Sequence, residues 1–526
     1  MPEWTTLKRM IWLLLLRGAS AVIRTVTGTS PLVLENAVAA AIKSLKQYGK
    51  CTQSTTPTPS APVDIVCNNG AIKYGALGAN LLDPSAANTV LKYYINKADG
   101  EVKPSPPNFM FAGYMPVTPG TTYVAYGRAK TGNDLSDYNR VAWYDSTKTW
   151  ISGANYTQNQ IAVVTAPENA AYARFSCNPS GTTTQTVTQE YVDSFNWTFC
   201  EGTAEITPFV PFVGGIYTDG TPEVLTVSGK NEANVEDYLL SFTNRYYVDK
   251  AIGVTLEAGV TYTFSCDIEC SITPFGISVG VGNDVVYLVD IVTKPKQTNG
   301  RIFVTFTPST AALSNYSKLY VRIPRFTEAK TGTVSVSKIQ LERSSSATDY
   351  EPYVTPQTVT DIPMLLSVND YKDESEIISG LLTHKVGIKV LDGTESWALS
   401  DSGSTHRFRG TKPSDCHTPA SRAPSVCTHF KYVSTGSAVG GMFIGASQYW
   451  YFIPTDQTID TVDKWTAWVA GQYAAGTPVI VLYPLATEQT EQTTAHALHT
   501  SNGDNVVDVV SNVDPVELEV EYSASE

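Results

Sequence analysis

KIQLERSSSATDYEPY (residues 338–353) begins like a β-strand and ends in an irregular tail that carries two tyrosines around a glutamate and a proline. FCEGTAEITPFVPF (residues 199–212) ends in the same way, with identical spacing between its glutamate and its aromatic–x–Pro–aromatic group. A Gly-x-Asn group, a Gly-x-Thr-Tyr turn and a Tyr-x-Arg strand also recur in the same order. Such a series of landmarks is typical of a duplicated domain with variable loops. The two copies span residues 80–213 and 231–354.

The stretch TVSVSKIQL, which ends at Leu341, predicts the last strand of the second copy. Val334 and Val336 share one face of that strand. Ile339 and Leu341 continue the alternation one residue out of phase, so a bulge near Lys338 is predicted to keep all four side chains on the core side.

The aromatic tails are predicted to close the open end of each copy. An irregular segment needs apolar anchors to stay ordered, and a proline leaves no exposed backbone donor at a strand edge. We therefore expect a domain seal, rather than a binding site, from Phe209, Pro211, Phe212, Tyr350, Pro352 and Tyr353.

The composition limits both fold and function. At 526 residues the chain is too long for one core, which predicts three or four domains. Only 17% of residues are charged and the net charge is −13, which argues against binding to nucleic acid. The 29 tyrosines, with frequent Thr, Val, Gly and Pro, indicate short strands bounded by turns. The predicted fold class is mainly β: tandem jelly-roll β-sandwiches with a small N-terminal β module and a C-terminal α+β module.

Four segments surround the copies. Residues 1–20 form an N-terminal extension and residues 21–79 form the N-terminal β module. Residues 214–230 form a linker or strand, and residues 355–526 form the C-terminal α+β module. Residues 34–45 fit a helix or a strand equally well.

The C-terminal module contains the best helix pattern of the chain. Trp465, Val469 and Tyr473 share one face of a predicted helix over residues 461–473. Asp460 or Thr461 can cap its start, and a glycine and a proline follow its end.

The N-terminal extension carries the elements of an export signal. Lys8 and Arg9 precede a seven-residue apolar run, and an Ala-Ser-Ala group follows it. The run is short for such a signal and is closed at once by Arg17. An extension that starts too early is the alternative interpretation. The run is too short to span a bilayer, and no other segment is apolar enough.

Motifs for catalysis and metal binding are scarce. The chain has no Gly-x-Ser-x-Gly elbow, no His-Glu-x-x-His helix and no phosphate loop. Adjacent Cys-His pairs are poor zinc chelators, so a zinc site is the less favoured interpretation of Cys416, His417, Cys427 and His429. The eight cysteines are sparse, and buried free thiols are expected. No catalytic residue is named.

Carbohydrate binding needs only an exposed aromatic ring with polar groups beside it. The alternative is that these rings fill the core, as strand aromatics usually do. The candidate glycan-binding rings are Tyr138, Trp143, Trp150 and Tyr156 around one hairpin of the first copy, Tyr246 and Tyr247 in the second, and Trp450 within a Tyr-Trp-Tyr triplet of which one side faces outward.

Several strings of the sequence resemble a known family of proteins. TLEAGVTYTFSCDIE, followed by KIQLERSSSATDYEPY, resembles the carbohydrate-binding-module-like jelly rolls of virion proteins from tailed phages and prophages of Gram-positive gut bacteria. TVTGTSPLVLENAVAAAIKSLKQYGK and GIKVLDGTESW are similar to the N-terminal and C-terminal modules of those proteins. The resemblance starts near Val22 and leaves residues 1–20 as a departure. It implies a minor structural protein of tail-fibre or baseplate type and transfers no catalytic residue and no ligand.

The leading hypothesis is a non-enzymatic virion adhesin that is assembled in the host cytoplasm and binds a host cell-surface polysaccharide. Other virion proteins and further copies of the chain, in a homo-oligomer, are the other expected partners. One alternative is a cell-wall or capsule polysaccharide hydrolase (depolymerase) with binding modules. Another is a capsid or tail decoration protein without glycan affinity. No cofactor is predicted, although structural calcium, held by dispersed loop oxygens, is compatible with the sandwiches.

Overall fold

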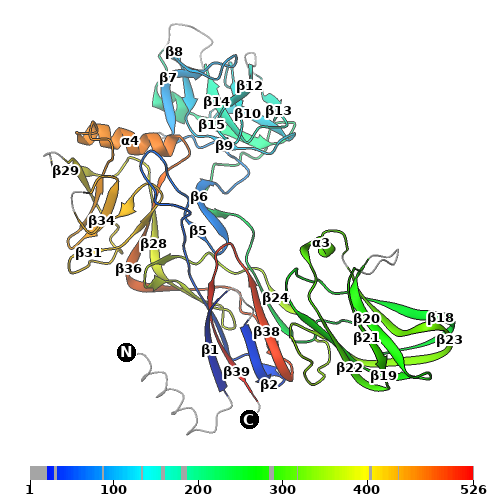
Figure 1. Cartoon of the computed structure of the whole chain (residues 1–526). Coiled ribbons are helices and arrows are strands. Elements are labelled where there is room, and N and C mark those ends of the chain that lie inside the picture. Colours follow the sequence, from blue (N-terminus) through cyan, green and yellow to red (C-terminus); the bar gives the residue numbers. More distant parts are fainter. Residues whose placement is uncertain are drawn as a thin grey trace.

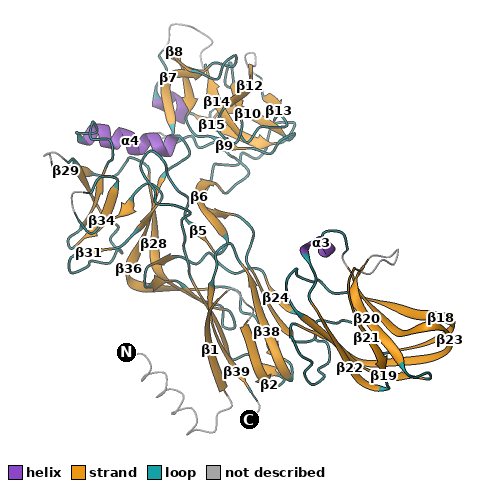
Figure 2. Cartoon of the chain, viewed as in Figure 1, coloured by secondary structure: helices purple, strands orange, loops and turns teal. Residues whose placement is uncertain are grey.

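The structure is a computed structural model that describes residues 21–28, 32–85, 88–131, 134–155, 160–178, 186–282, 289–316, 318–401, 405–435 and 438–524. Strands dominate these residues, and helices are few and short (Figure 2). Two β-sandwiches project in different directions from a central body (Figure 1). The predicted mainly β class with tandem sandwiches is confirmed. Within the described ranges, no helix combines the length and the apolar character that a membrane crossing requires.

The first sandwich lies within residues 80–213 and consists of two sheets that enclose an aromatic core. Its elements are β7 (Thr89–Ile95), β8 (Val102–Phe111), β9 (Met115–Pro116), β10 (Thr122–Ala129), β11 (Arg140–Tyr144), β12 (Trp150–Asn155), β13 (Ala162–Thr165), β14 (Tyr172–Cys177), α2 (Gln189–Asp193) and β15 (Phe195–Glu201). One sheet has the order β13-β10-β15, and the other has the order β12-β11-β14-β8-β7 with β9 beside β14.

The second sandwich lies within residues 231–354 and repeats this arrangement. Its elements are β18 (Tyr238–Ile252), β19 (Tyr262–Cys270), β20 (Phe275–Gly282), β21 (Val289–Gln297), β22 (Gly300–Phe306), α3 (Thr310–Leu313) and β23 (Lys318–Glu342). The first part of β23 pairs with β20 and its last part pairs with β19, so this one long strand takes the places of β14 and β15. The shared strand order supports the duplication inferred from the landmarks.

A buried asparagine occupies the same position in both sandwiches. Asn80 Nδ2 donates to the carbonyls of Trp197 and Val210, at 2.7 and 3.0 Å, and Asn231 Nδ2 donates to those of Ile339 and Glu351, both at 2.9 Å. Each Oδ1 accepts two further backbone N–H groups, one from the following residues and one from the last strand. The asparagine of the Gly-x-Asn landmark therefore ties the first segment, the last strand and the tail of each copy together.

This clamp changes the explanation of the aromatic tails. Phe209 and Tyr350 are 39% and 38% exposed, while Phe212 and Tyr353 are half-buried. The predicted seal is therefore partial, because one ring of each tail is half-buried and the other is exposed. The backbone also holds the tail, because the clamp asparagines bind tail carbonyls, and Gln340 Oε1 accepts the N–H of the tail at 2.7 Å.

The bulge predicted in the last strand of the second copy is present. In the pairing of β19 with β23, Ser265 lies opposite Gln340 but Asp267 lies opposite Ser337, so the register shifts between them. Lys338 has a φ of 49°, the left-handed conformation that such a bulge requires. As a result, all four apolar residues of the stretch TVSVSKIQL, which ends at Leu341, are buried in one core.

The central body combines segments from both ends of the chain and from between the sandwiches. Its largest sheet contains β1 (Ala21–Gly28), β39 (Val516–Ser523), β4 (Ser44–Tyr48), β27 (Glu374–Glu376), β28 (Leu381–Leu391), β36 (Val479–Gln492) and β32 (Val426–Cys427), in that order. A four-stranded sheet contains β2 (Leu32–Ala37), β38 (Gly503–Val510), β17 (Val224–Gly229) and β24 (Gln357–Val359), and a three-stranded sheet contains β16 (Gly214–Asp219), β6 (Gly70–Ala76) and β5 (Val66–Cys67). Short pairs are β3 (Ala40–Ala41) with β37 (His499–Thr500), and β25 (Ser367–Val368) with β26 (Tyr371–Lys372).

This topology differs from the separate modules expected from the sequence. Residues 21–79 and 355–526 do not form independent units, because β1 and β4 both pair with β39. Residues 214–230 are not a free linker either, since β17 pairs with β38 and β16 pairs with β6. The ambiguous residues 34–45 form strands, and no part of them is helical.

A buried polar cluster holds these distant segments together. Glu223 Oε2 accepts hydrogen bonds from Gln47 Nε2 and Asn68 Nδ2, both at 2.7 Å. The same asparagine accepts the N–H of Leu365 at 2.9 Å, and its carbonyl accepts Asn512 Nδ2 at 2.9 Å. Burial raises the pKa of the Glu223 carboxyl above its ordinary value, and the two amide donors oppose that rise.

The C-terminal part of the body carries the predicted helix. The helix, α4 (Val462–Ala474), begins after Thr461, whose hydroxyl accepts the N–H of Lys464. It packs through Trp465 and Val469 on a sheet of β29 (Trp397–Asp401), β30 (Arg407–Thr411), β35 (Tyr449–Ile453), β34 (Gly441–Gly445) and β31 (Arg422–Ala423), with β33 (Lys431–Tyr432) beside β34. This confirms the predicted helix and places it over an antiparallel sheet.

Candidate functional site

The candidate rings of the first copy do not form a common platform. Trp143 is 3% exposed and lies in the sandwich core. Trp150 is half-buried against Gly100 in the neighbouring hairpin. Tyr138 is exposed on the loop before β11, and Tyr156 lies outside the described residues. The prediction is therefore wrong for Trp143, because its position on β11 points inward.

In the second copy, the two predicted tyrosines do reach the surface. Tyr246 and Tyr247 are 56% and 41% exposed on β18. The guanidinium of Arg322 lies 4.0 Å from the ring centre of Tyr247 and pairs with Asp249 at 2.7 Å. These contacts hold Arg322 over one face of Tyr247.

In the Tyr-Trp-Tyr triplet, the predicted ring, Trp450, points into the core instead of to the surface. Trp450 is 1% exposed and belongs to the core under α4, so it cannot be a surface ring. Alternation on β35 places Tyr449 and Tyr451 on the outer side of the sheet instead.

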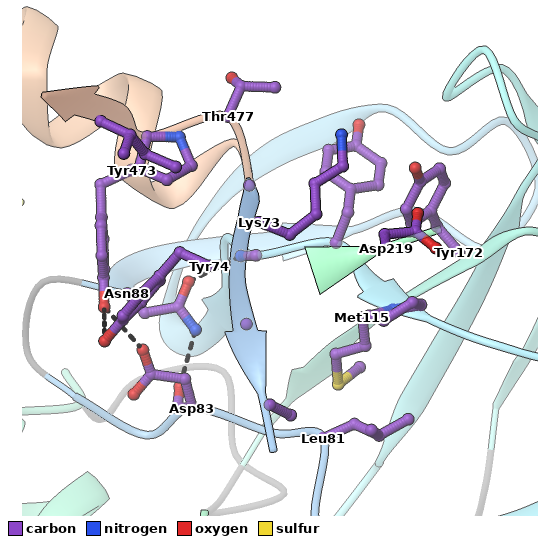
Figure 3. Close-up of a pocket in the computed structure, with 18 of the residues that line it drawn as sticks. Lys73, Tyr74, Leu81, Asp83, Asn88, Met115, Tyr172, Asp219, Tyr473 and Thr477 are labelled. Atoms are coloured by element: carbon purple, nitrogen blue, oxygen red, sulfur yellow. Dashed lines mark hydrogen bonds between the residues drawn. The ribbon is translucent and has the colours of Figure 1, made fainter. Parts of the chain in front are cut away.

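A cavity of about 370 Å³ lies where the first sandwich meets the body. Its walls come from β6 and β16, from the edge of the first sandwich at β9 and β14, and from the segment that follows α4 (Figure 3). This volume is in the range of small-ligand sites, which often occur at domain junctions. None of the six predicted rings that the structure describes lines the cavity.

Two tyrosines from distant segments form one wall of the cavity. Tyr74 on β6 and Tyr473 on α4 have ring centres 5.6 Å apart. The hydroxyl of Tyr473 lies 3.3 Å from that of Tyr74 and 3.5 Å from Asp83 Oδ2, as Figure 3 shows. Burial, with the Tyr74 hydroxyl as a further cause, raises the pKa of Tyr473, so its hydroxyl stays protonated and donates.

A lysine and two further tyrosines form the wall at the first sandwich. Lys148 Nζ lies 4.9 and 5.8 Å from the ring centres of Tyr114 and Tyr172 and donates to the carbonyl of Ala475 at 2.9 Å. Burial lowers the pKa of Lys148. The bond to Ala475 also fixes the first sandwich to the end of α4, where carbonyl groups without helical partners favour a cation.

Lys73 on β6 and Asp219 on β16 also line the cavity, and Figure 3 labels both beside Tyr172. Lys73 pairs with Asp64 at 2.6 Å, and both residues line the cavity. Tyr217 lies against Gly75 on the paired strand, and burial raises the pKa of its phenol. This part of the cavity therefore combines tyrosine rings with charged side chains of both signs.

A histidine lies at the inner end of this set of residues. His429 is 1% exposed, and its Nδ1 lies 2.9 Å from the hydroxyl of Thr428. Burial lowers the pKa of its imidazole to about 4, so the ring is neutral at pH 7. Its Nε2 has no hydrogen-bond partner among the described residues, although the side chain of Gln472 lies nearby.

Metal chemistry finds no support at the cysteines and histidines. Across the described ranges, no group of three or more His, Cys, Asp and Glu side chains is placed to hold a metal ion. His417 lies against Tyr371, whereas His429 lies against Trp468, so the two histidines face different surroundings. Burial raises the pKa of Cys416 to about 11 and of Cys427 to about 12, which keeps both thiols protonated.

Sequence reasoning missed the cavity because its residues come from many distant segments of the chain. Tyr473 was assigned to the apolar face of a helix, and Tyr74 belongs to a strand whose partner, β16, was read as a possible linker. No local spacing connects these residues. Only the pairing of β6 with β16 and the docking of the first sandwich bring them together.

The comparisons with known proteins give weak likenesses only. No protein-family model matches the chain, and no curated protein matches it. A CBM22-1-CBM22-2 tandem domain from Paenibacillus barcinonensis Xyn10C is similar over 53% of this chain and 99% of its own length, at 10% identity and a TM-score of 0.15. The structure of infectious bursal disease virus Gx strain matches 96% of this chain and 80% of its own length, at 9% identity and a TM-score of 0.16. T=1 particles derived from that virus match 96% and 79%, at 8% identity and a TM-score of 0.12. At such TM-scores these likenesses assign no function.

Proposed function

We propose that this protein is a non-enzymatic virion structural protein, of tail-fibre or baseplate type, that binds a host cell-surface glycan. The observation that carries the glycan part is the cavity at the junction of the first sandwich and the body. It offers the two things that a sugar needs, namely aromatic faces and converging polar groups.

Each part of the cavity has a role in this proposal. The C–H face of a sugar ring packs on tyrosine rings such as Tyr172 and Tyr217. Its hydroxyls bond the charged groups Lys73 and Asp219. The neutral imidazole and the protonated phenols favour a neutral glycan at this site.

The virion part of the proposal rests on the resemblance of several sequence strings to virion proteins of tailed phages and on the architecture. Two copies of one sandwich on a common body can present repeated weak binding surfaces, and a homo-oligomer would multiply them. Attachment to the particle is assigned to the body, which contains residues 21–79.

A glycan array probed with the full chain tests the proposal. We expect binding to a neutral glycan that falls roughly tenfold in Tyr217→Ala, as a loss of about 1.4 kcal/mol would give. Tyr246→Ala is the matched control, because it removes an exposed tyrosine of the second sandwich. Equal losses in both variants, or a loss only in the control, would contradict the assignment to the cavity. No binding on an array that includes cell-wall polysaccharides would overturn the glycan function itself.

A second measurement addresses the absence of catalysis. Incubation of the full chain with the polysaccharide that it binds should release no new reducing ends. Steady release, abolished by a carboxylate variant at the cavity such as Asp219→Asn, would show a depolymerase instead.

A further inference from the structure

The outer face of the sheet under α4 carries a layer of arginines and aromatic rings. This sheet lies at the left edge of the molecule in Figure 1. Its inner side chains, such as Phe408 and Trp450, belong to the core below α4. Alternation then places a different set of side chains on the other face, namely Arg407, Arg409, Arg422, Phe443, Tyr449 and Tyr451.

Four of these residues form one continuous stack. The guanidinium of Arg422 lies 4.2 Å from the ring centre of Phe443. Phe443 and Tyr451 are stacked, with ring centres 4.8 Å apart and planes inclined by 16°. The guanidinium of Arg407 lies 5.5 Å from the ring centre of Tyr451. Two cations therefore flank two stacked rings, each held by a cation–π contact.

A third arginine lies beside this stack. The guanidinium of Arg409 is 4.6 Å from the ring centre of Tyr449. Its Nε is buried and has no hydrogen-bond partner within the part of the chain that the structure describes. Burial of an N–H donor without an acceptor costs free energy, and an acceptor from a ligand would remove that cost.

The charge on this face is unbalanced. Arg407 lies 3.9 Å from Asp401, whereas neither Arg409 nor Arg422 forms an ion pair within 4.0 Å among the described residues. The whole chain nevertheless has a net charge of −13. The three guanidiniums on one sheet face are thus a local positive surface on an acidic protein, and such a surface attracts anions.

We infer that this face binds the oxyanion groups of an acidic polysaccharide. This inference rests on the proposed glycan-binding function and adds a second site with a different ligand chemistry. A guanidinium that is held on a ring has a fixed orientation, so its N–H edge meets carboxylate or phosphodiester oxygens at little entropic cost. The partly exposed rings of Tyr449 and Tyr451 provide contact area for the sugars beside those anions.

Nucleic acid is the less favoured polyanion. A duplex binds through many Lys and Arg side chains that each neutralise a phosphate, whereas this face has three arginines. An acidic glycan with widely spaced charges matches three cations on neighbouring strands better than a nucleic acid does.

Binding of the full chain to three immobilised polymers tests the inference: polygalacturonate, its fully methyl-esterified form, and poly(glycerol phosphate). We expect binding to at least one of the two acidic polymers, none to the esterified form, and weakening as salt is raised. Arg409→Gln should weaken binding roughly tenfold. Arg409→Lys keeps the charge but not the planar fork, and should lie between Arg409→Gln and the wild type. Lys130→Gln, an exposed lysine of the first sandwich, controls for the change in net charge.

Several results would overturn the inference. These are no binding to either acidic polymer, equal binding to the esterified form, wild-type affinity of Arg409→Gln, or equally tight binding of duplex DNA. Unfolding midpoints for each variant show whether a loss reflects misfolding, and Arg422→Gln provides a second test if Arg409→Gln is unstable. If this inference fails, the proposal of neutral-glycan binding at the junction cavity still stands. Tyr217→Ala should not change the affinity for the acidic polymers.

Discussion

A single amide side chain accounts for much of the integrity of each sandwich. Asn231 bonds four backbone groups that belong to the start, the last strand and the tail of the second copy. Because the side chain is 2% exposed, water cannot replace those bonds when it is removed.

We expect Asn231→Ala to lower the free energy of unfolding of the second sandwich by about 2–4 kcal/mol, since buried donors and acceptors lose their partners. Urea unfolding of the full chain, followed by hydrogen exchange to locate the loss, measures this. Asn80→Ala should produce the same loss in the first sandwich only. A change below about 0.5 kcal/mol, the size expected of an ordinary surface substitution, would show that the clamp is not needed.

Glu223 makes the stability of the body depend on pH. Its folded-state pKa is raised by burial, so its contribution is complete below the ordinary value of 4.5 and is lost as the pH rises through the raised value. We expect Glu223→Gln to become more stable relative to the wild type as the pH increases from about 4.5 towards 8. Urea unfolding of both proteins across that range checks the sign, and a difference that does not vary with pH would contradict it.

At the scale of elements, the β-bulge decides which residues enter the second core. Lys338→Val should strain the left-handed backbone on which the bulge depends, because a β-branched residue disfavours a φ of 49°, and should lower the free energy of unfolding by about 1–3 kcal/mol. Lys338→Gly is the control, because it keeps the register and suits the left-handed backbone, so its effect should stay within about 1 kcal/mol. Thermal unfolding of both variants compares them. Equal stability would mean that the bulge does not depend on that backbone conformation.

Element-level predictions succeeded where a pattern is local. The bulge follows from apolar residues one position out of phase, and α4 follows from one apolar face with a capping threonine. The orientation of single rings was less accessible. Trp143 and Trp450 are core residues, because which side of a strand faces the core depends on the opposing sheet and not on the strand itself.

At the scale of the whole molecule, the sequence identified the duplicated sandwiches but not the composite body. Internal repeats reveal themselves by comparison within one chain. The pairing of β4 with β39, and of β17 with β38, joins segments with no repeat and no shared motif. The junction cavity depends on that same long-range pairing, so none of its lining tyrosines could be assigned to a site beforehand.

The composite body predicts how fragments behave. Residues 231–354 expressed alone should fold, because this sandwich has its own core and its own clamp. Residues 355–526 alone should not fold, since β27 and β39 would lose β4 as their shared neighbour. Circular dichroism and proton NMR dispersion of the two fragments test this. A cooperatively unfolding 355–526 fragment would show that the body consists of separable modules after all.

The position of β38 and β39 also bears on the order in which the chain matures during translation. Both sandwiches are complete long before these strands leave the ribosome, whereas β2, β4 and β17 wait for them as neighbours. A nascent chain that pauses just before β38 would therefore carry two folded sandwiches and an incomplete body. Its early strands would be open to proteases and chaperones until the final stretch arrives.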